Sequence, residues 1–309
     1  METRALRYFQ TVAECGSYSR GARLLRISQP AVSRQIRQLE NELGRPLFKR
    51  HGHGVSLTPA GRILLERSQT ALRQLEQTKT EIRDGGAGPS GVISFAVPPA
   101  AGHFLVPALI ERFGAEFPVV FLKIRGGFSG SIHEWLTRGQ VDLACVHDLA
   151  PLPGFEIIPL VEEPVYLVGK RGVAPFRRGH AYVEDLAGLP LILPGRPNAS
   201  RRQLDGWVAS RRLTLNVKLE VDDHSVIRAL IKKGIGFSLL TQGAIEAELR
   251  RGEVEAFPFR PGVRWPLALV ASINAPRPDI VDAFIRAIRA TVRELTKSGA
   301  WPGRLLDKA

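Results

Sequence analysis

Cysteine is scarce in this sequence, with 2 among 309 residues. Small secreted proteins that depend on disulfides carry many more. Cys15 and Cys145 fall in different predicted domains, so we expect no bridge between them and interpret both as buried structural thiols. The scarcity of cysteine favours a cytoplasmic protein.

Long hydrophobic runs are absent as well. No run of about 18 or more apolar residues occurs, which excludes a membrane-spanning helix. Residues 1–10 lack the apolar core of a signal peptide and begin a helical pattern instead. Hydrophobic residues nevertheless make up 44% of the chain, enough for sizeable cores. The length predicts two or three domains.

Signatures of several enzyme classes are missing. The sequence has no G-x-S-x-G, H-E-x-x-H, C-x-x-C or phosphate loop ending in GK[ST]. Residues 126–131, GGFSGS, lack the third glycine of a dinucleotide fingerprint. The histidines are scattered, and His51 and His53 are interpreted as facing phosphate or solvent. We therefore expect no catalytic residue, no cofactor and no metal.

Positive charge, in contrast, is abundant, with a formal net charge of +13. Residues 1–88 hold 15 Lys and Arg against 8 Asp and Glu, which gives them more than half of the excess. This distribution favours a nucleic-acid-binding module at the N-terminus. A solvated cationic surface is the alternative.

Hydrophobic periodicity predicts short helices near 3–14 and 19–25, a third between Ser28 and Gly44, and a hairpin, or wing, over 45–58. Gly16 ends the first helix, Ser19 is the expected N-cap of the second, and Ser28 caps the third. This order, with a tight turn between the second and third helices, predicts a winged helix-turn-helix.

The third helix has two contrasting faces. Its apolar face carries Val32, Ile36, Leu39 and Leu43, and its polar face carries Pro30, Arg34, Arg37 and Asn41, with Ser33 at the edge. The second helix of such a motif reaches base edges. Gln29 suits adenine, Arg34 or Arg37 suits guanine, and Ser33 suits phosphate or a base. Lys49 and Arg50 of the wing suit the DNA backbone or the minor groove. A surface helix with ordinary arginines is the alternative.

A fourth helix, at about 59–84, begins after the cap Thr58. Its heptad positions hold Leu65, Ser68, Leu72, Leu75, Lys79 and Ile82. We expect the apolar members Leu65, Leu72, Leu75 and Ile82 to pair with a second copy, because a long apolar stripe usually needs a partner helix. Packing back on the same domain is the alternative. The Gly- and Ser-rich segment 84–91 predicts a linker.

Strands and helices alternate after residue 91. Strands are predicted at 92–97, 119–124 and 141–146, and at the segments FEIIPL, VYLVG, LILP, KLEV, FSLL and LALVAS. Helices are predicted near 103–116, 130–138, 200–211, 224–233, 242–250 and 278–296. This alternation predicts parallel sheets covered by helices, in two α/β subdomains.

Ligands of open α/β folds bind at the carboxyl ends of strands, where helix N-termini attract anions. Four such junctions stand out, at 98–102, 127–131, 194–202 and 222–225. We expect a small anionic metabolite between the two subdomains. The candidate residues are Pro99, Ala100, Ala101, Phe128, Ser129, Pro194, Ser200, Arg201, His224 and Ser225. Ordinary helix caps are the alternative.

The stretch FQTVAECGSYSRGARLLRISQPAVSRQIRQLENELGRPLFKRHGHGVSLTPAGRILL resembles the DNA-binding domain of the LysR-type transcriptional regulators. The resemblance extends to FSGSIHEWLTRGQVDLACV and EVDDHSVIRALIKKGIGFSLL, and its details are closest to the nitrogen-assimilation-control branch. It implies contacts to promoter DNA from Gln29, Pro30, Ser33, Arg34 and Arg50. It also places effector-cleft positions at the four junctions.

The resemblance further implies the overall arrangement: a winged helix-turn-helix over 1–58, a dimerisation helix and hinge over 59–91, and a periplasmic-binding-protein-like effector domain over 92–309. Its first subdomain covers about 92–161 and 267–309, and its second about 162–266, joined by two crossovers. A homodimer assembling to a homotetramer is implied, with RNA polymerase as a further partner.

Three departures from the family pattern affect which family properties can be expected of this sequence. Gly21 stands where the family has alanine, which costs about 1 kcal/mol of helix propensity. His51 and His53 replace the usual wing residues, which weakens the expected grip on phosphate. The first cleft loop, PPAAG, lacks the Ser or Thr that many relatives use to hold a carboxylate, so the effector class is open.

Two other functions are compatible with parts of the sequence. An enzyme or solute-binding domain with a basic tail would account for 92–309 equally well. A sequence-neutral architectural DNA binder would account for the charge of the N-terminal segment. Specific recognition of an operator, in preference to random DNA, separates a regulator from both.

Overall fold

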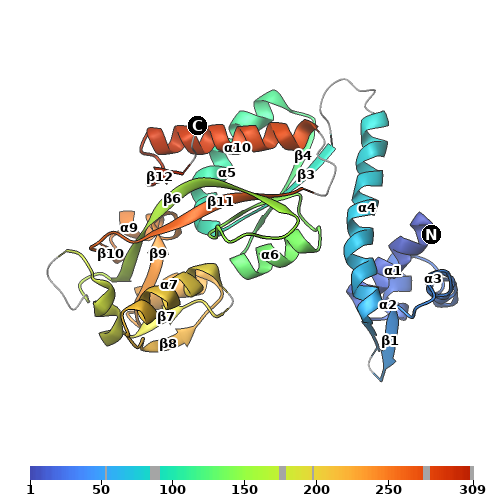
Figure 1. Cartoon of the computed structure of the whole chain (residues 1–309), viewed down its shortest axis with the longest axis horizontal. Coiled ribbons are helices and arrows are strands. Elements are labelled where there is room, and N and C mark those ends of the chain that lie inside the picture. The colour runs from blue at the N-terminus through green and yellow to red at the C-terminus, as the bar shows by residue number, and fades with distance from the viewer. Residues whose placement is uncertain (53, 84–90, 174–178, 197, 274–278, 307–309) are drawn as a thin grey trace. The chain divides into compact units, whose positions relative to one another are not determined.

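The computed structural model describes residues 1–52, 54–83, 91–173, 179–196, 198–273 and 279–306 (Figure 1). The chain forms two compact units, one containing Met1–Gly91 and the other containing Val92–Glu134 and Val141–Ala309. Most of the predicted linker, residues 84–90, lies outside the described residues.

The first unit contains the three predicted short helices, α1 (Thr3–Cys15), α2 (Tyr18–Leu25) and α3 (Gln29–Leu43). Gly16 and Gly44 end α1 and α3 in the left-handed conformation, at φ of 60° and 63°. The expected N-cap of α2 was wrong by two residues. Ser17, with extended backbone, accepts a hydrogen bond from the Arg20 amide, whereas Ser19 lies inside the helix.

The apolar face of α3 packs into the core of this unit. Val32, Ile36 and Leu39 are almost fully buried, together with Phe9 and Val12 of α1. The prediction for Leu43 was wrong, since 40% of its surface is exposed. Leu43 is the last residue of α3, so the apolar face predicted for this helix extends beyond the part that is packed in the core.

The wing is an antiparallel pair of strands, β1 (Phe48–His51) and β2 (Gly54–Leu57). Glu40 of α3 fixes its start, because one carboxylate oxygen accepts from the Leu47 amide at 2.7 Å and from the Phe48 amide at 3.3 Å. The wing is therefore anchored to α3 by charge-assisted hydrogen bonds as well as by the shared core.

The fourth helix, α4, spans Pro59–Arg83, and the Thr58 hydroxyl caps it by accepting from the Gly61 amide at 3.0 Å. Its apolar stripe divides into two parts. Leu65 and Leu72 pack into the core of their own unit, as the alternative interpretation expected. Leu75 and Ile82 are 45% and 75% exposed and remain available to a partner.

Both cysteines are free thiols. Cys145 is buried in the second unit, and burial raises the pKa of its thiol. Cys15, at the end of α1, is only partly buried, so the expectation of two buried thiols holds for Cys145 alone.

The second unit is built on an eight-stranded sheet. Its main path runs β10 (Val254–Pro258), β6 (Phe155–Lys170), β11 (Arg264–Ser272), β5 (Leu143–Val146), β3 (Gly91–Val97) and β4 (Val120–Gly126), while β9 (Ser238–Thr241) and β12 (Arg304–Leu305) pair with β6. The expectation of parallel sheets was only partly right. β3 and β5 are parallel, but β6 and β11 are antiparallel to their neighbours.

The long strand β6 replaces the two short strands predicted at FEIIPL and VYLVG. Its first part, 155–164, pairs with β11, and its last part, 165–170, pairs with β9 and β10. β6 and β11 thus run through both halves of the unit and connect them as an antiparallel ribbon.

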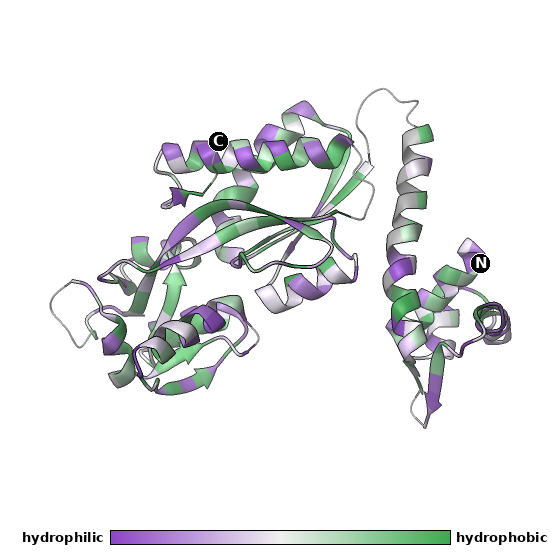
Figure 2. Ribbon diagram, viewed as in Figure 1, coloured by the Kyte–Doolittle hydropathy of each residue, from purple (hydrophilic) through white to green (hydrophobic). Residues whose placement is uncertain are grey.

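Two lobes are distinguishable by their hydrophobic cores. In the first lobe, α5 (Pro99–Glu116) and the amphipathic α10 (Asp279–Lys297) pack on each other and on the sheet (Figures 1 and 2). Phe113 and Phe284 make an edge-to-face contact, with ring centroids 4.9 Å apart. The strand β11 and the helix α10, from the end of the chain, contribute residues to this core. The helix α6 spans Ser129–Thr137.

The second lobe contains the parallel pair β7 (Leu191–Leu193) and β8 (Val217–Glu220) and the helices α7 (Ala199–Ser210) and α8 (His224–Lys232). The 3-10 helix η1 (Val183–Gly188) was not predicted. The helix expected at 242–250 is divided into the 3-10 turn η2 (Gln242–Ala244) and α9 (Glu246–Arg250). None of the helices in the described part of the chain is both long and apolar enough to span a membrane.

Gly21 of α2 has a structural role that helix propensity alone does not indicate. A Cβ atom there would lie 2.9 Å from a Val12 methyl carbon and 3.3 Å from the Val12 Cα. The absence of a side chain therefore lets α2 approach α1 closely.

We expect Gly21→Ala to lower the melting temperature of the first unit, although alanine favours helix. Overpacking costs about 1–3 kcal/mol against a propensity gain of about 1 kcal/mol. The control is Gly206→Ala in α7, where a Cβ meets nothing within 4 Å and stability should rise. Thermal unfolding measures both variants, and equal stabilisation by the two would contradict the packing role.

Candidate functional sites

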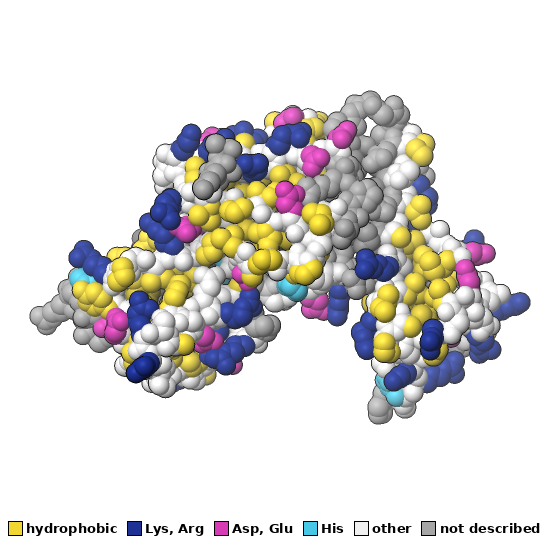
Figure 3. Space-filling model, viewed as in Figure 1, with side chains coloured by type: hydrophobic (Ala, Val, Ile, Leu, Met, Phe, Trp, Pro, Cys, Tyr) yellow, Lys and Arg dark blue, Asp and Glu magenta, His cyan; other side chains and the backbone are white. Residues whose placement is uncertain are grey.

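The first candidate site is the polar face of α3. Gln29, Pro30, Arg34 and Arg37 are exposed and Ser33 is half-buried, while the opposite face of the helix is buried. Because the apolar face fixes the helix on its core, these side chains point to solvent. Figure 3 shows Lys and Arg side chains gathered over this unit. The face offers guanidinium, amide and hydroxyl groups, which bind base edges and phosphates.

The wing adds two cations beside this helix in the same unit. Lys49 and Arg50 of β1 are both exposed. The Arg50 guanidinium carbon lies over the Tyr18 ring, 5.6 Å from its centroid, and burial raises the pKa of Tyr18. Tyr18 in turn makes an edge contact with Phe48 at 5.6 Å. His51 is exposed, whereas His53 lies outside the described residues.

The second candidate site is a pocket in the other unit, with a volume of about 40 Å³. All four predicted junctions contribute to its wall. The lining residues are Pro98, Ala100, Phe128, Ser129, His147, Pro194, Asn198, Ser200, His224, Ile227, Leu239, Leu240, Thr241 and Trp265. Mostly apolar walls with a few polar groups are typical of small-molecule sites.

Six of the ten predicted effector residues line this pocket: Ala100, Phe128, Ser129, Pro194, Ser200 and His224. The other four do not. Pro99 is exposed on the first turn of α5, and Ala101 is buried in the core of the first lobe. Arg201 and Ser225 make contacts elsewhere.

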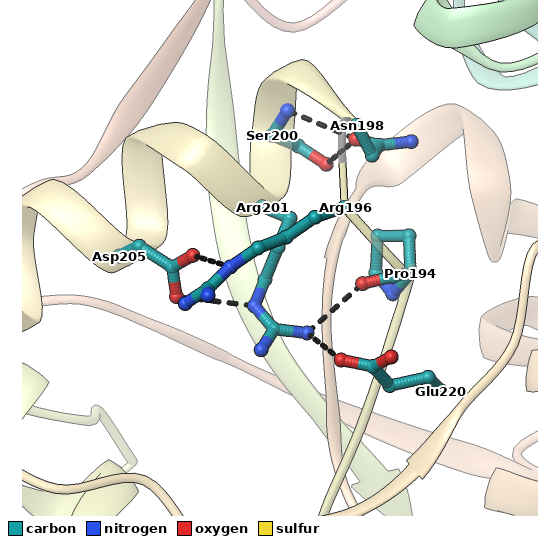
Figure 4. A network of polar contacts seen from close by, with 7 residues as sticks. All are labelled: Pro194, Arg196, Asn198, Ser200, Arg201, Asp205 and Glu220. Carbon is teal, nitrogen blue, oxygen red and sulfur yellow. Dashed lines mark hydrogen bonds and ion pairs between the residues drawn. The ribbon is translucent and has the colours of Figure 1, made fainter.

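Arg201 is occupied by an internal network (Figure 4). Its guanidinium donates to Glu220 at 2.9 Å, to the Pro194 carbonyl at 3.0 Å and to Asp205 at 3.1 Å. Asp205 also accepts from Arg196, and these arginines hold its pKa below the usual value against the opposing effect of burial. The charge of Arg201 is thus neutralised by carboxylates of its own lobe, which a sequence cannot reveal.

Ser225 belongs to the cap of α8 and is exposed. Its hydroxyl donates to Asp223, whose carboxylate also accepts from the Ser225 and Val226 amides. The Ser225 hydroxyl and these amides lower the pKa of Asp223. At this junction the ordinary helix cap, proposed as the alternative, accounts for Ser225.

Polar contacts beside the pocket connect α7 to the start of α6 and to the loop after β5 in the first lobe. The Ser129 hydroxyl accepts from the Ala199 amide at 2.8 Å, and the Gln203 side chain donates to the His147 carbonyl at 2.8 Å. Arg202 pairs with Asp148. On another side, Gly243 lies so close to the Ala100 carbonyl that a Cβ would approach it to 2.1 Å. The lobes are therefore closed on each other around the pocket.

His147 was missed by the sequence analysis, although it follows β5 directly. The rule that selected the other junctions, the carboxyl end of a strand, would have selected it. Its Nε2 lies 2.7 Å from Glu163, which is buried on β6 and also accepts from the Trp301 indole at 3.0 Å. Trp265 lies opposite Glu163 on β11. No sequence pattern marks Glu163.

Three buried polar atoms of the pocket residues have no hydrogen-bond partner among the described residues. They are Nε1 of Trp265, Oγ1 of Thr241 and Nδ1 of His224. Leaving such atoms unpaired in a protein interior costs about 1–3 kcal/mol each. A ligand with matching groups would therefore be stabilised here.

His224 stacks on Phe128, with ring centroids 4.6 Å apart and planes inclined by 17°. Burial lowers the pKa of His224 to about 4, helped by His147 and Arg228 and opposed by Asp223. At neutral pH this wall of the pocket is an uncharged aromatic pair.

Comparison with known proteins gives consistent matches over most of the chain. A family model described as "Bacterial regulatory helix-turn-helix protein, lysR family" matches residues 3–62, and one described as "LysR substrate binding domain" matches 86–293. The transcriptional regulator BbuR of Bordetella bronchiseptica is 30% identical over 98% of this chain and 94% of its own. The nitrogen assimilation regulatory protein nac of Escherichia coli is 32% identical over 89% of each chain.

Solved structures show the same fold. A full-length OxyR variant from Pseudomonas aeruginosa superposes with a TM-score of 0.70 at 25% identity, over 94% of this chain and 95% of that one. The LysR family transcriptional regulator CbnR gives a TM-score of 0.72 at 24% identity, over 94% and 99% of the two chains.

We expect His224→Phe to reduce the acid sensitivity of the second unit. Because the pKa of His224 is lower in the fold than the unfolded value of about 6.5, the wild type loses stability as pH falls from there towards 4. This contribution is on the order of 3 kcal/mol. Phenylalanine retains the stack on Phe128 without taking up a proton.

Melting temperatures of both proteins between pH 8 and pH 4 measure the effect. The variant should lose less stability than the wild type over this interval. Parallel curves would show that His224 is not held uncharged.

Proposed function

The chain belongs to the LysR family of DNA-binding transcriptional regulators, and on that premise we propose which residues bind DNA and where the effector binds. Its relatives are regulators of transcription and not enzymes. The interpretation as an enzyme with a basic tail therefore has no support. The family combines a helix-turn-helix with an effector-binding domain, and both are present here.

We propose that α3 enters the major groove of operator DNA. One observation carries this assignment, namely that the apolar face of α3 is buried while its polar face is exposed. Gln29, Arg34 and Arg37 then lie at base edges, with Pro30 at the start of the helix. Ser33, Lys49 and Arg50 contact phosphates or the minor groove.

We further propose three functional regions: the DNA-binding domain 1–58, the dimerisation helix and hinge 59–91, and the effector domain 92–309. Within the effector domain, one subdomain covers about 92–161 and 267–309 and the other about 162–266. Two of the three described hydrophobic cores of this unit lie one in each subdomain and are joined by β6 and β11, which supports this division, while the third packs Ala100 of the first subdomain against residues of the second.

The pocket between these lobes is the proposed effector site. Its unpaired buried polar atoms and its closed walls support a small ligand. An effector that binds the closed form more tightly than the open form shifts the equilibrium between them. The pairing of Arg201 with carboxylates removes the main support for an anionic effector.

Dimerisation through α4 is proposed on the exposed apolar residues Leu75 and Ile82. Leu65 and Leu72, also expected in the interface, contribute by supporting α4 from within their own domain. We propose a homodimer that assembles to a homotetramer on promoter DNA in the cytoplasm, where RNA polymerase acts. A dimer would place two recognition helices on two half-sites.

Arg34→Ala should weaken binding to the protein's own operator by about 1–3 kcal/mol, because a bidentate arginine contact to a base is lost. Arg4→Ala, on the exposed face of α1, removes the same charge and serves as the control. Fluorescence anisotropy at fixed salt, on operator and on random DNA, measures the affinities. Equal losses of affinity in the two variants would show that Arg34 contributes only its positive charge and no specific base contact.

Replacing both Leu75 and Ile82 by serine should weaken the dimer at least tenfold, because about 25 cal/mol of hydrophobic stabilisation is lost per Å² of apolar surface left exposed. Ile63→Ser is the control, since Ile63 is also exposed on α4 but lies on another face. Sedimentation equilibrium measures the dissociation constants. An unchanged dimer in the double variant would place the interface elsewhere.

A further inference from the structure

The pocket contains very little formal charge. Among the described residues that line it there is no Lys, Arg, Asp or Glu. The candidate cation Arg201 is paired with Asp205 and Glu220, and the adjacent Arg202 is paired with Asp148. The titratable side chains of the lining are His147 and His224.

One buried carboxylate lies directly behind this lining. Glu163 is 1% exposed, and its two oxygens face two different rings. Oε1 accepts from the Trp301 indole at 3.0 Å, and Oε2 lies 2.7 Å from Nε2 of His147. An indole N–H only donates, and an ionised carboxylate only accepts. Oε1 already has a donor in the Trp301 indole, so an ionised Glu163 leaves Oε2 to accept from His147.

This contact determines where His147 carries its hydrogen. Because Nε2 must donate to the carboxylate, the neutral ring is the Nε2–H tautomer. Nδ1, which makes no hydrogen bond to the described residues, is then an acceptor. His147 therefore requires a hydrogen-bond donor from a ligand. A histidine without this contact could present either a donor or an acceptor to the ligand.

The neighbouring Trp265 ring carries a donor. The Trp265 ring is 6.3 Å from the His147 ring, centroid to centroid, and its buried Nε1–H has no partner among the described residues. The Thr241 hydroxyl, also buried and unpaired there, adds a group that can donate or accept. A compact ligand group that carries both a donor and an acceptor satisfies this set.

We propose that the pocket selects an uncharged ligand group with a donor beside an acceptor, as in a primary amide, and that Glu163 imposes this selection. It does so as a positioning residue, by fixing the tautomer of His147 from behind the wall. The proposal rests on the assignment of the pocket as the effector site, and names the chemical class of its ligand.

A carboxylate of the same size is disfavoured for two reasons. Its oxygens meet the lone pair of His147 Nδ1, and the charge of Glu163 lies just beyond the ring in a medium of low dielectric constant. No described cation of the lining compensates. Binding of a carboxylate would require the uptake of a proton by the site.

Glu163→Gln inverts this arrangement with little change in shape. The amide oxygen still accepts from Trp301, and the amide nitrogen donates to Nε2 of His147. The hydrogen of His147 is thereby moved to Nδ1, where it faces the ligand as a donor. The control is Glu162→Gln, which removes a neighbouring charge on β6 that pairs with Arg304 instead.

The tautomer is measured directly by long-range proton–nitrogen correlation spectra of the histidine rings at pH 8. We expect a neutral Nε2–H ring in the wild type and in Glu162→Gln, and an Nδ1–H ring in Glu163→Gln. A protonated His147 at this pH, or the same tautomer in all three proteins, would overturn the proposal.

The ligand class is measured with acetamide and acetate, two probes of matched size, by titration of the indole N–H signal of Trp265. Trp265→Phe assigns that signal. Acetamide should bind the wild type at least tenfold more tightly than acetate, and Glu163→Gln should reduce or reverse this ratio. Preference for acetate in the wild type, an unchanged ratio in the variant, or no binding of either probe contradicts the proposed class.

These measurements involve no DNA, so their failure is distinguishable from failure of the DNA-binding assignment. A normal loss of operator affinity in Arg34→Ala together with an Nδ1–H tautomer in wild-type His147 would overturn the ligand class alone.

Discussion

The antiparallel pairing of β6 with β11 is the constraint on which the effector domain depends. These two strands pass through both lobes, so each lobe is completed by segments that begin in the other. Glu163 and Trp265 face each other in this ladder, beside the pocket. Polar groups of the pocket are therefore held by the strands that connect the lobes. A ligand that shifts these groups acts directly on the connection between the lobes.

A comparable constraint operates in the DNA-binding domain. Burial of Val32, Ile36 and Leu39 fixes the rotation of α3 about its axis, and this rotation determines which side chains are exposed. Gly21 allows α2 to approach α1, and Glu40 attaches the wing to α3. The proposed recognition surface is thus positioned by contacts on the opposite face of α3.

Local signals in the sequence predicted the local structure well. The helices of the N-terminal unit, the wing and the four junctions follow from periodicity, caps and strand ends, which involve neighbouring residues. The continuity of β6 was missed because Pro159 and Glu162–Pro164 resemble a break between strands, whereas pairing with three other strands sustains it. Long-range pairing likewise determines the environment of Arg201, because its guanidinium donates to Glu220, which is 19 residues away in the sequence.

Charge and burial within the sites also depend on contacts between residues that are distant in the sequence. Leu65 and Leu72 carry the heptad pattern of an interface but fill the core of their own unit. Glu163 gave no signal because its partners, His147 and Trp301, are distant in sequence and no motif connects them. The sequence pattern selected four junctions that line one pocket, but the polarity of this pocket depends on contacts that only the fold creates.

The central claim is that the exposed face of α3 lies in the major groove of the operator. A photo-crosslinking amino acid at position 37, on that face, tests it most directly when compared with one at position 24, an exposed residue of α2. We expect crosslinks from position 37 to bases of a specific site and few from position 24. Equal crosslinking from both positions, or crosslinks from 37 that are indifferent to DNA sequence, would contradict it.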